Sequence, residues 1–174
     1  MSIIIEHATI DDLDTLTTLI NDSYEVETGD TGVAFKKAKR IAIPERDLLP
    51  YIQQQRTIKA ILNNTIVGTL VYEIMEDKIV IENNTNTVNR LHFGPFAVDP
   101  KLQGQGIGKA LLTYVYTMAK EKNCVSIDIE VVHLRTDIIP MYIKLGYEKI
   151  GEAPFPRPEY TTRECHFVLL RKVL

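Results

Sequence analysis

Residues 103–108 read Gln-Gly-Gln-Gly-Ile-Gly, between a strand-like run that ends Phe96-Ala97-Val98-Asp99-Pro100 and a helix-like run that begins near Gly106. Alternating glycines let a backbone turn tightly and approach a ligand closely. The helix that follows points its free N–H groups and the positive end of its dipole at the same place. This stretch therefore predicts an anion site for a phosphate or pyrophosphate group.

The glycine spacing excludes the two commonest phosphate-binding loops. A Walker A loop ending at Gly108 and Lys109 would need glycine at position 103 and serine or threonine at position 110, but the chain has Gln103 and Ala110. A dinucleotide fingerprint would need its third glycine at position 109 or 111, where lysine and leucine stand. The pattern that remains is glutamine, then glycine at the third and fifth positions after it.

This pattern resembles motif A of the GCN5-related N-acetyltransferases (GNAT), because Ala-Val-Asp-Pro precedes it at 97–100 and Lys-Ala-Leu-Leu follows it at 109–112. The segment Met141–Tyr147 resembles a second motif of that family, built around Tyr142. The stretch from Leu134 to Val168 is similar to an uncharacterised subgroup of small acetyltransferases. The resemblance extends over nearly the whole chain. It implies acetyl-CoA as co-substrate and an amine as acceptor.

The pattern of apolar residues predicts alternating strands and helices. Strands are expected at 2–7, 57–62, 66–75, 91–98, 125–131, 147–150 and 165–173, and helices at 13–24, 44–52, 106–122 and 136–145. Residues 76–89 are polar and are expected to form a loop around a short hairpin extension. This order predicts an α/β (α+β) fold. The resemblance implies a mixed, mostly antiparallel sheet of about seven strands with helices on both faces.

The Gly94-Pro95 pair interrupts the strand that leads into motif A. Proline has no N–H for the ladder, so a β-bulge or a local split of the sheet is expected there. A split leaves strand donors and acceptors free for a ligand that adds like a strand. The resemblance accordingly implies a split between the motif A strand and the next strand.

Length and composition fit one domain over 1–174. Hydrophobic residues make up 45% and charged residues 25% of the chain, and the net charge of -3 argues against a nucleic-acid partner. No leader and no membrane-spanning run are evident, so a cytoplasmic protein is expected. Cys124 and Cys165 have no metal-binding spacing and are expected to be reduced thiols, and no metal is expected. The partner expected is a small-molecule or peptide amine, and the protein is expected to be a monomer or a homodimer.

Two groups of residues are expected to hold the cofactor. The resemblance implies that the backbone of the motif A strand binds the pantetheine arm and steadies the oxyanion. The glycine loop and the helix start are expected to bind the pyrophosphate. The cofactor-binding residues expected are Phe96, Ala97, Val98, Gln103, Gly104, Gln105, Gly106, Ile107, Gly108 and Lys109.

Acetyl transfer to an amine needs a base for the ammonium proton and an acid for the departing thiolate. A phenol is protonated at neutral pH, so Tyr142 is the expected acid. Glu130, on the polar face of its strand, is the expected base, and His92, Glu25, Glu27 and a water chain to a carboxylate are alternatives. Glu25 and Arg157 are expected to contact the acceptor.

One residue departs from the family pattern. Arg135 stands seven residues before Tyr142, where many members carry an asparagine that contacts pantetheine. Either that contact is lost, or backbone groups replace it.

Two other functions compete with the acetyltransferase hypothesis. A non-catalytic acyl-CoA-binding module would keep 103–108 but have no working acid, and Tyr142 argues against it. A dinucleotide-binding enzyme would use Asp128, about 20 residues after the glycines, as a ribose ligand. The glycine spacing argues against that reading.

Overall fold

The computed structural model describes residues 2–27, 39–81, 84–156, 161 and 164–174. Its centre is one open sheet in the order β1-β2-β3-β4-β5-β7-β6. Neighbouring strands are antiparallel except β4 and β5, which are parallel. The predicted mixed, mostly antiparallel seven-stranded sheet is therefore confirmed. The strands are β1 (Ile4–His7), β2 (Thr57–Leu62), β3 (Thr65–Ile81), β4 (Asn84–Val98), β5 (Cys124–Val132), β6 (Glu148–Pro154) and β7 (His166–Val173).

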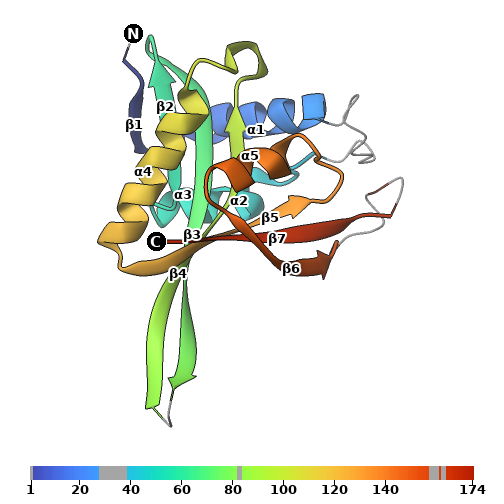
Figure 1. Cartoon of the computed structure of the whole chain (residues 1–174). Coiled ribbons are helices and arrows are strands. Elements are labelled where there is room, and N and C mark those ends of the chain that lie inside the picture. The colour runs from blue at the N-terminus through green and yellow to red at the C-terminus, as the bar shows by residue number, and fades with distance from the viewer. Residues whose placement is uncertain (1, 28–38, 82–83, 157–160, 162–163) are drawn as a thin grey trace.

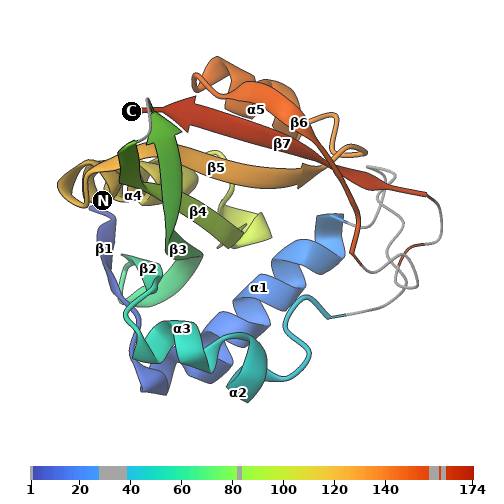
Figure 2. The same ribbon diagram turned by 90° about the horizontal axis from the view of Figure 1, so that it is seen from below.

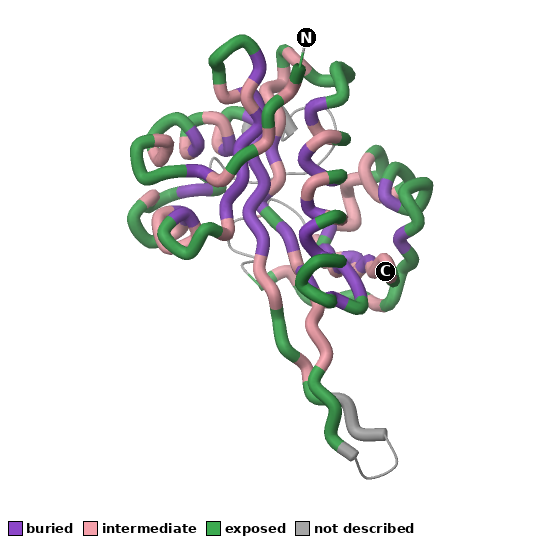
Figure 3. The backbone as a smooth tube through the Cα atoms, turned by 90° about the vertical axis from the view of Figure 1, so that its left-hand side faces the viewer, coloured by how far each residue is buried: buried purple, intermediate pink, exposed green. Residues whose placement is uncertain are grey.

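Helices cover both faces of the sheet (Figures 1 and 2). One face carries α4 (Ile107–Glu121) and α5 (Ile138–Lys144), and the other carries α1 (Leu13–Glu27), α2 (Pro44–Asp47) and α3 (Leu49–Gln53). Each face has its own apolar core, and Figure 3 shows the buried backbone between the layers. None of the described helices is both long and apolar enough to span a membrane.

The sequence pattern of α4 predicts its packing correctly. Its apolar stripe, Ile107, Leu111, Val115, Met118 and Ala119, is buried in the core that it shares with β3, β4 and β5. Its first turn lies close to Gly68 of β3. A Cβ added there would come within 2.9 Å of the Ile107 side chain, so a glycine lets the helix start approach the sheet.

One prediction of local structure was wrong, and another was right only in part. The single helix expected over 44–52 is two short helices joined at Leu48, because Pro50 lacks an N–H and its ring disfavours a continuous helix. The short hairpin extension expected at Lys78–Ile81 is present but longer than expected. The far parts of β3 and β4 form a two-stranded ribbon that projects from the sheet (Figures 1 and 3). Its described side chains are mostly exposed, so its sequence carries no apolar alternation.

The bulge and the split are both present. Leu70 pairs with Phe96 and Tyr72 pairs with Phe93, so Gly94 and Pro95 together stand opposite Val71. Two residues opposite one form a β-bulge.

Pairing between β4 and β5 runs only from Asn89 and Cys124 to His92 and Asp128. Beyond this point β4 continues to Val98 and β5 to Val132 without pairing to each other. The two strands therefore diverge just before the bulge.

Candidate functional site

The glycine loop forms the turn between β4 and α4. Gly104 and Gly106 have φ angles of +78° and +84°, in the left-handed region where a side chain is strained. Asp99 opens the turn, since its carboxylate accepts the N–H of Lys101 at 2.9 Å. Gly106 caps α4, whose first turn leaves its N–H groups without partners inside the helix. The turn therefore presents backbone donors and a helix dipole in one place.

The end of β4 lies against this turn. A Cβ on Gly108 would stand 3.3 Å from the Phe96 ring, so a glycine keeps the helix start close to the strand. Ile107 is buried, whereas Gln103, Gln105 and Lys109 are exposed. The fold thus brings the strand end and the loop together, with the donor groups of the loop on the surface.

Gly106 and Lys109 also line a shallow hollow of about 520 Å³ along the side of α4. A hollow of about 600 Å³ lies farther along the helix, around His7 and Tyr114. Among the predicted site residues that the structure describes, none lines this second hollow.

On the opposite face, α1 is fixed to the end of β4. The buried hydroxyl of Ser23 donates to the Val98 carbonyl at 3.0 Å. Ala97 faces the same side and is 3% exposed within the core under α1. The strand end is therefore held rigidly from one side by the helix and from the other by the glycine turn.

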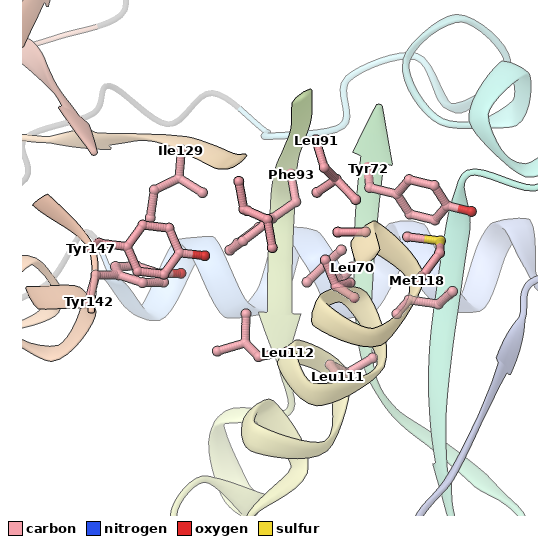
Figure 4. Close-up of a cluster of buried hydrophobic side chains, with 14 of the residues drawn as sticks. Leu70, Tyr72, Leu91, Phe93, Leu111, Leu112, Met118, Ile129, Tyr142 and Tyr147 are labelled. Atoms are coloured by element: carbon pink, nitrogen blue, oxygen red, sulfur yellow. The ribbon is translucent and has the colours of Figure 1, made fainter. Parts of the chain in front are cut away.

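Tyr142 lies beside the point where β4 and β5 diverge. Its ring centroid is 6.3 Å from that of Phe93 and 5.3 Å from that of Tyr147. Figure 4 shows both tyrosine rings pointing from the α5 side toward Phe93, with Ile129 of β5 next to them. Tyr142, the acid expected from the sequence, is only 6% exposed and so lies within the core. Burial raises the pKa of Tyr147, and the nearby Tyr116 adds to this shift, so Tyr147 stays protonated.

Polar side chains occupy the other face of the same point. Leu91 and Phe93 are buried on the α4 side, so His92 between them faces the α1 side. Asp128 faces the same way, because Ile127 and Ile129 flank it in the α4-side core. Glu130 lies two residues farther along β5 and is exposed.

Asp128 is bound by two arginines. Arg171 donates to its two carboxylate oxygens at 2.8 and 2.6 Å, and Arg90 donates to it at 3.3 Å. Burial opposes ionisation, but the hydrogen bonds of Arg171 and Ser126 and the two positive charges outweigh it and lower the pKa of Asp128. A carboxylate engaged in this way is poorly suited to bind a ribose. The structure therefore weighs against the dinucleotide alternative.

Arg135 is also engaged in an ion pair. Its guanidinium donates twice to Asp137, at 2.9 Å each, and its side chain is 12% exposed. This pair stands at the start of α5, where many family members would place an asparagine. Hydrogen bonding from Arg135 lowers the pKa of Asp137.

Two of the predicted site residues cannot be placed. Arg157 lies outside the described residues, as does the side chain of Glu25. Within the part of the chain that is described, no group of three His, Cys, Asp or Glu side chains could hold a metal ion.

One feature of the site escaped the sequence analysis. Glu73 pairs with His92, and His92 pairs with Asp128, so these three side chains form one row across three strands. Only the sheet register reveals this row. The separate polar positions in each strand were the available signal.

Comparison with known proteins agrees with this geometry. The model of the Acetyltransferase (GNAT) family matches residues 16–147. No curated protein sequence matches the chain.

Several solved structures share the fold. PaiA N-acetyltransferase from Thermoplasma acidophilum, in complex with coenzyme A, aligns over 100% of both chains with 18% identity and a TM-score of 0.73. An N-acetyltransferase from Staphylococcus aureus Mu50 aligns over 99% of both chains with 13% identity and a TM-score of 0.72. Arabidopsis thaliana Naa50, in complex with the bisubstrate analogue CoA-Ac-MVNAL, aligns over 100% of both chains with 19% identity and a TM-score of 0.70. The family model covers most of the sequence, and the chain belongs to the GNAT acetyltransferase family.

Proposed function

We propose that this chain is an acetyl-CoA-dependent N-acetyltransferase, a single domain over 1–174, that acts on a primary amine by direct attack in a ternary complex. The observation that carries the proposal is the position of the glycine turn beside the split between β4 and β5. Gly106 caps α4 next to the end of β4, and β4 separates from β5 six residues before Val98. A pyrophosphate on the turn and an extended pantetheine along β4 fit this arrangement.

The cofactor-binding residues are those of the β4 end and the turn. The N–H groups at the start of α4 bind the pyrophosphate, and exposed Lys109 adds a positive charge. Backbone groups of Phe96, Ala97 and Val98 bind the pantetheine amides and polarise the thioester carbonyl. The coenzyme A and bisubstrate complexes of PaiA and Naa50 support a CoA ligand for this fold.

The proposed acid, Tyr142, and the proposed base, Glu130, lie on opposite faces of the sheet at the split. Tyr142, on the α5 side, donates a proton to the sulfur as the thiolate leaves. Glu130, exposed on β5, takes a proton from the acceptor ammonium and so frees the lone pair that attacks the thioester. Glu25 and Arg157 are proposed to contact the acceptor.

The test is an assay of thiol release from acetyl-CoA with a panel of primary amines. The panel contains a diamine, an amino acid, an aminoglycoside, a peptide with a free N-terminus and a peptide with an internal lysine. Mass spectrometry identifies the acetylated product. We expect amine-dependent release with at least one amine class, and a large loss of kcat in Glu130→Gln. Release that is no faster with any amine than with water would contradict the proposal.

A further inference from the structure

A row of ionisable side chains crosses the sheet where β4 and β5 diverge. Glu73 of β3, His92 of β4 and Asp128 of β5 are directly paired across neighbouring strands, and Arg171 of β7 pairs with Asp128. Directly opposed side chains on one face have Cβ atoms about 5 Å apart. Tyr72 and Ile74 belong to the α4-side core, so Glu73 shares the α1 side with His92. His92 therefore stands between two carboxylates.

The two carboxylates are not equivalent. Asp128 is neutralised by Arg171 and Arg90, as described above. Glu73 has the phenol of Tyr51 as a hydrogen-bonding neighbour, and burial together with Glu73 raises the pKa of Tyr51. Tyr51 stays protonated and neutral, so the charge of Glu73 is not cancelled by it.

The imidazole of His92 has unused hydrogen-bonding capacity. Its Nε2 atom is buried and makes no hydrogen bond to any residue that the structure describes. Buried polar atoms without partners are uncommon, and where they occur they call for an explanation such as a role in proton transfer. His92 is two residues from the bulge at Gly94 and lies on the face opposite the core that contains Tyr142.

The reaction removes two protons from the acceptor nitrogen, one before attack and one after it. A primary ammonium loses one proton before it attacks the thioester. After attack the nitrogen carries a positive charge and two protons, and it must lose another to become an amide. Glu130 in the proposed function accepts the first proton only. A base on the facing strand of the split accepts the second proton without waiting for Glu130 to release the first.

We propose that His92 is this second base. The nitrogen–carbon bond forms, His92 removes a proton from the attached nitrogen, and the carbonyl re-forms as the carbon–sulfur bond breaks. The bonding electrons leave with sulfur, which takes the Tyr142 proton. One of the two protons held by His92 and Glu130 returns to Tyr142 through water, and the other leaves to solvent. This inference rests on the proposed function of the same site.

The experiment measures kcat against pH for the wild type, His92→Gln and a matched control, His7→Gln. His7 lies beside Tyr114, in the hollow far along α4. We expect His92→Gln to lower kcat about a hundredfold or more and to remove the acidic limb between about pH 5 and 8. Its KM for acetyl-CoA and its thermal midpoint stay near the wild-type values, and His7→Gln behaves as the wild type.

A second variant keeps the imidazole. Glu73→Gln removes the carboxylate that faces His92 across β3 and β4, so kcat should fall while the KM for acetyl-CoA stays unchanged. This variant tests the assignment of His92 if His92→Gln fails to fold. An acidic limb that survives in His92→Gln, or a kcat that is unchanged in Glu73→Gln, would overturn the assignment of His92. Wild-type protein without amine-dependent turnover would instead overturn the proposed function.

Discussion

Gly106 tests whether the glycine turn serves the cofactor or only the fold. Its φ angle is +84°, and a Cβ added there would have no protein atom within 4 Å. Gly106→Ala therefore creates no internal clash, and its cost is that of placing alanine in the left-handed region. This cost is about 1–2 kcal/mol. For a chain of this length it corresponds to a fall in Tm of about 2–8 °C.

Gly146→Ala provides the matched control. Gly146 follows α5 with a φ angle of +87°, and the nearest atom to an added Cβ is the flexible end of Lys172. Both variants should lose similar stability without ligand. Only Gly106→Ala places a methyl group among the donors proposed to hold the pyrophosphate.

Calorimetric titration with free CoA separates the two effects. We expect the Kd for CoA to rise at least about tenfold in Gly106→Ala, or about 1.4 kcal/mol, and to change little in Gly146→Ala. Equal Tm losses with unchanged CoA affinity in both variants would refute the assignment of the turn to the cofactor.

Three further predictions concern the acid and the stability of the fold. Tyr142→Phe keeps the ring packed against Phe93 and should lower kcat at least about tenfold in the thiol-release assay, with CoA affinity unchanged. Gly68→Ala forces a Cβ within 2.9 Å of Ile107 and should cost about 1–3 kcal/mol in urea unfolding. Hydrogen bonding from Arg46 and two backbone N–H groups, against the opposing effect of burial, lowers the pKa of Asp47 from 3.8 to about 2. This stabilisation is present above pH 3.8 and is lost as the pH falls toward 2. In urea unfolding, Asp47→Asn should lower the free energy of unfolding by about 1 kcal/mol, a small loss because Arg46 is exposed. The difference between the variant and the wild type should shrink below about pH 4.

Much of the fold was predictable because its signals are local. The stripe of α4 follows from helical periodicity, and the bulge follows from the missing N–H of Pro95. Asn63 and Asn64 both have positive φ angles, as the hairpin turn between β2 and β3 predicts. The full length of the ribbon formed by the far parts of β3 and β4 was not predictable, because its pairing needs no apolar face. The break at Leu48 follows from Pro50, whose ring and missing N–H interrupt a continuous helix.

The candidate site was predictable only in part. The glycine turn and the end of β4 are adjacent in sequence, so their contact could be expected. The partners of Asp128, Arg90 and Arg171, lie 38 and 43 residues away from it, and strand order alone brings them together. The position of His92 between two carboxylates depends in the same way on register, which a single sequence does not specify across a crossover.

The most direct test of the account is a calorimetric titration of the wild-type protein with acetyl-CoA, free CoA and NADH in parallel. The glycine turn and the split between β4 and β5 predict saturable one-site binding of both CoA species and no binding of NADH. Absence of binding by both CoA species would contradict the central claim, because the GNAT fold would then be present without its cofactor site.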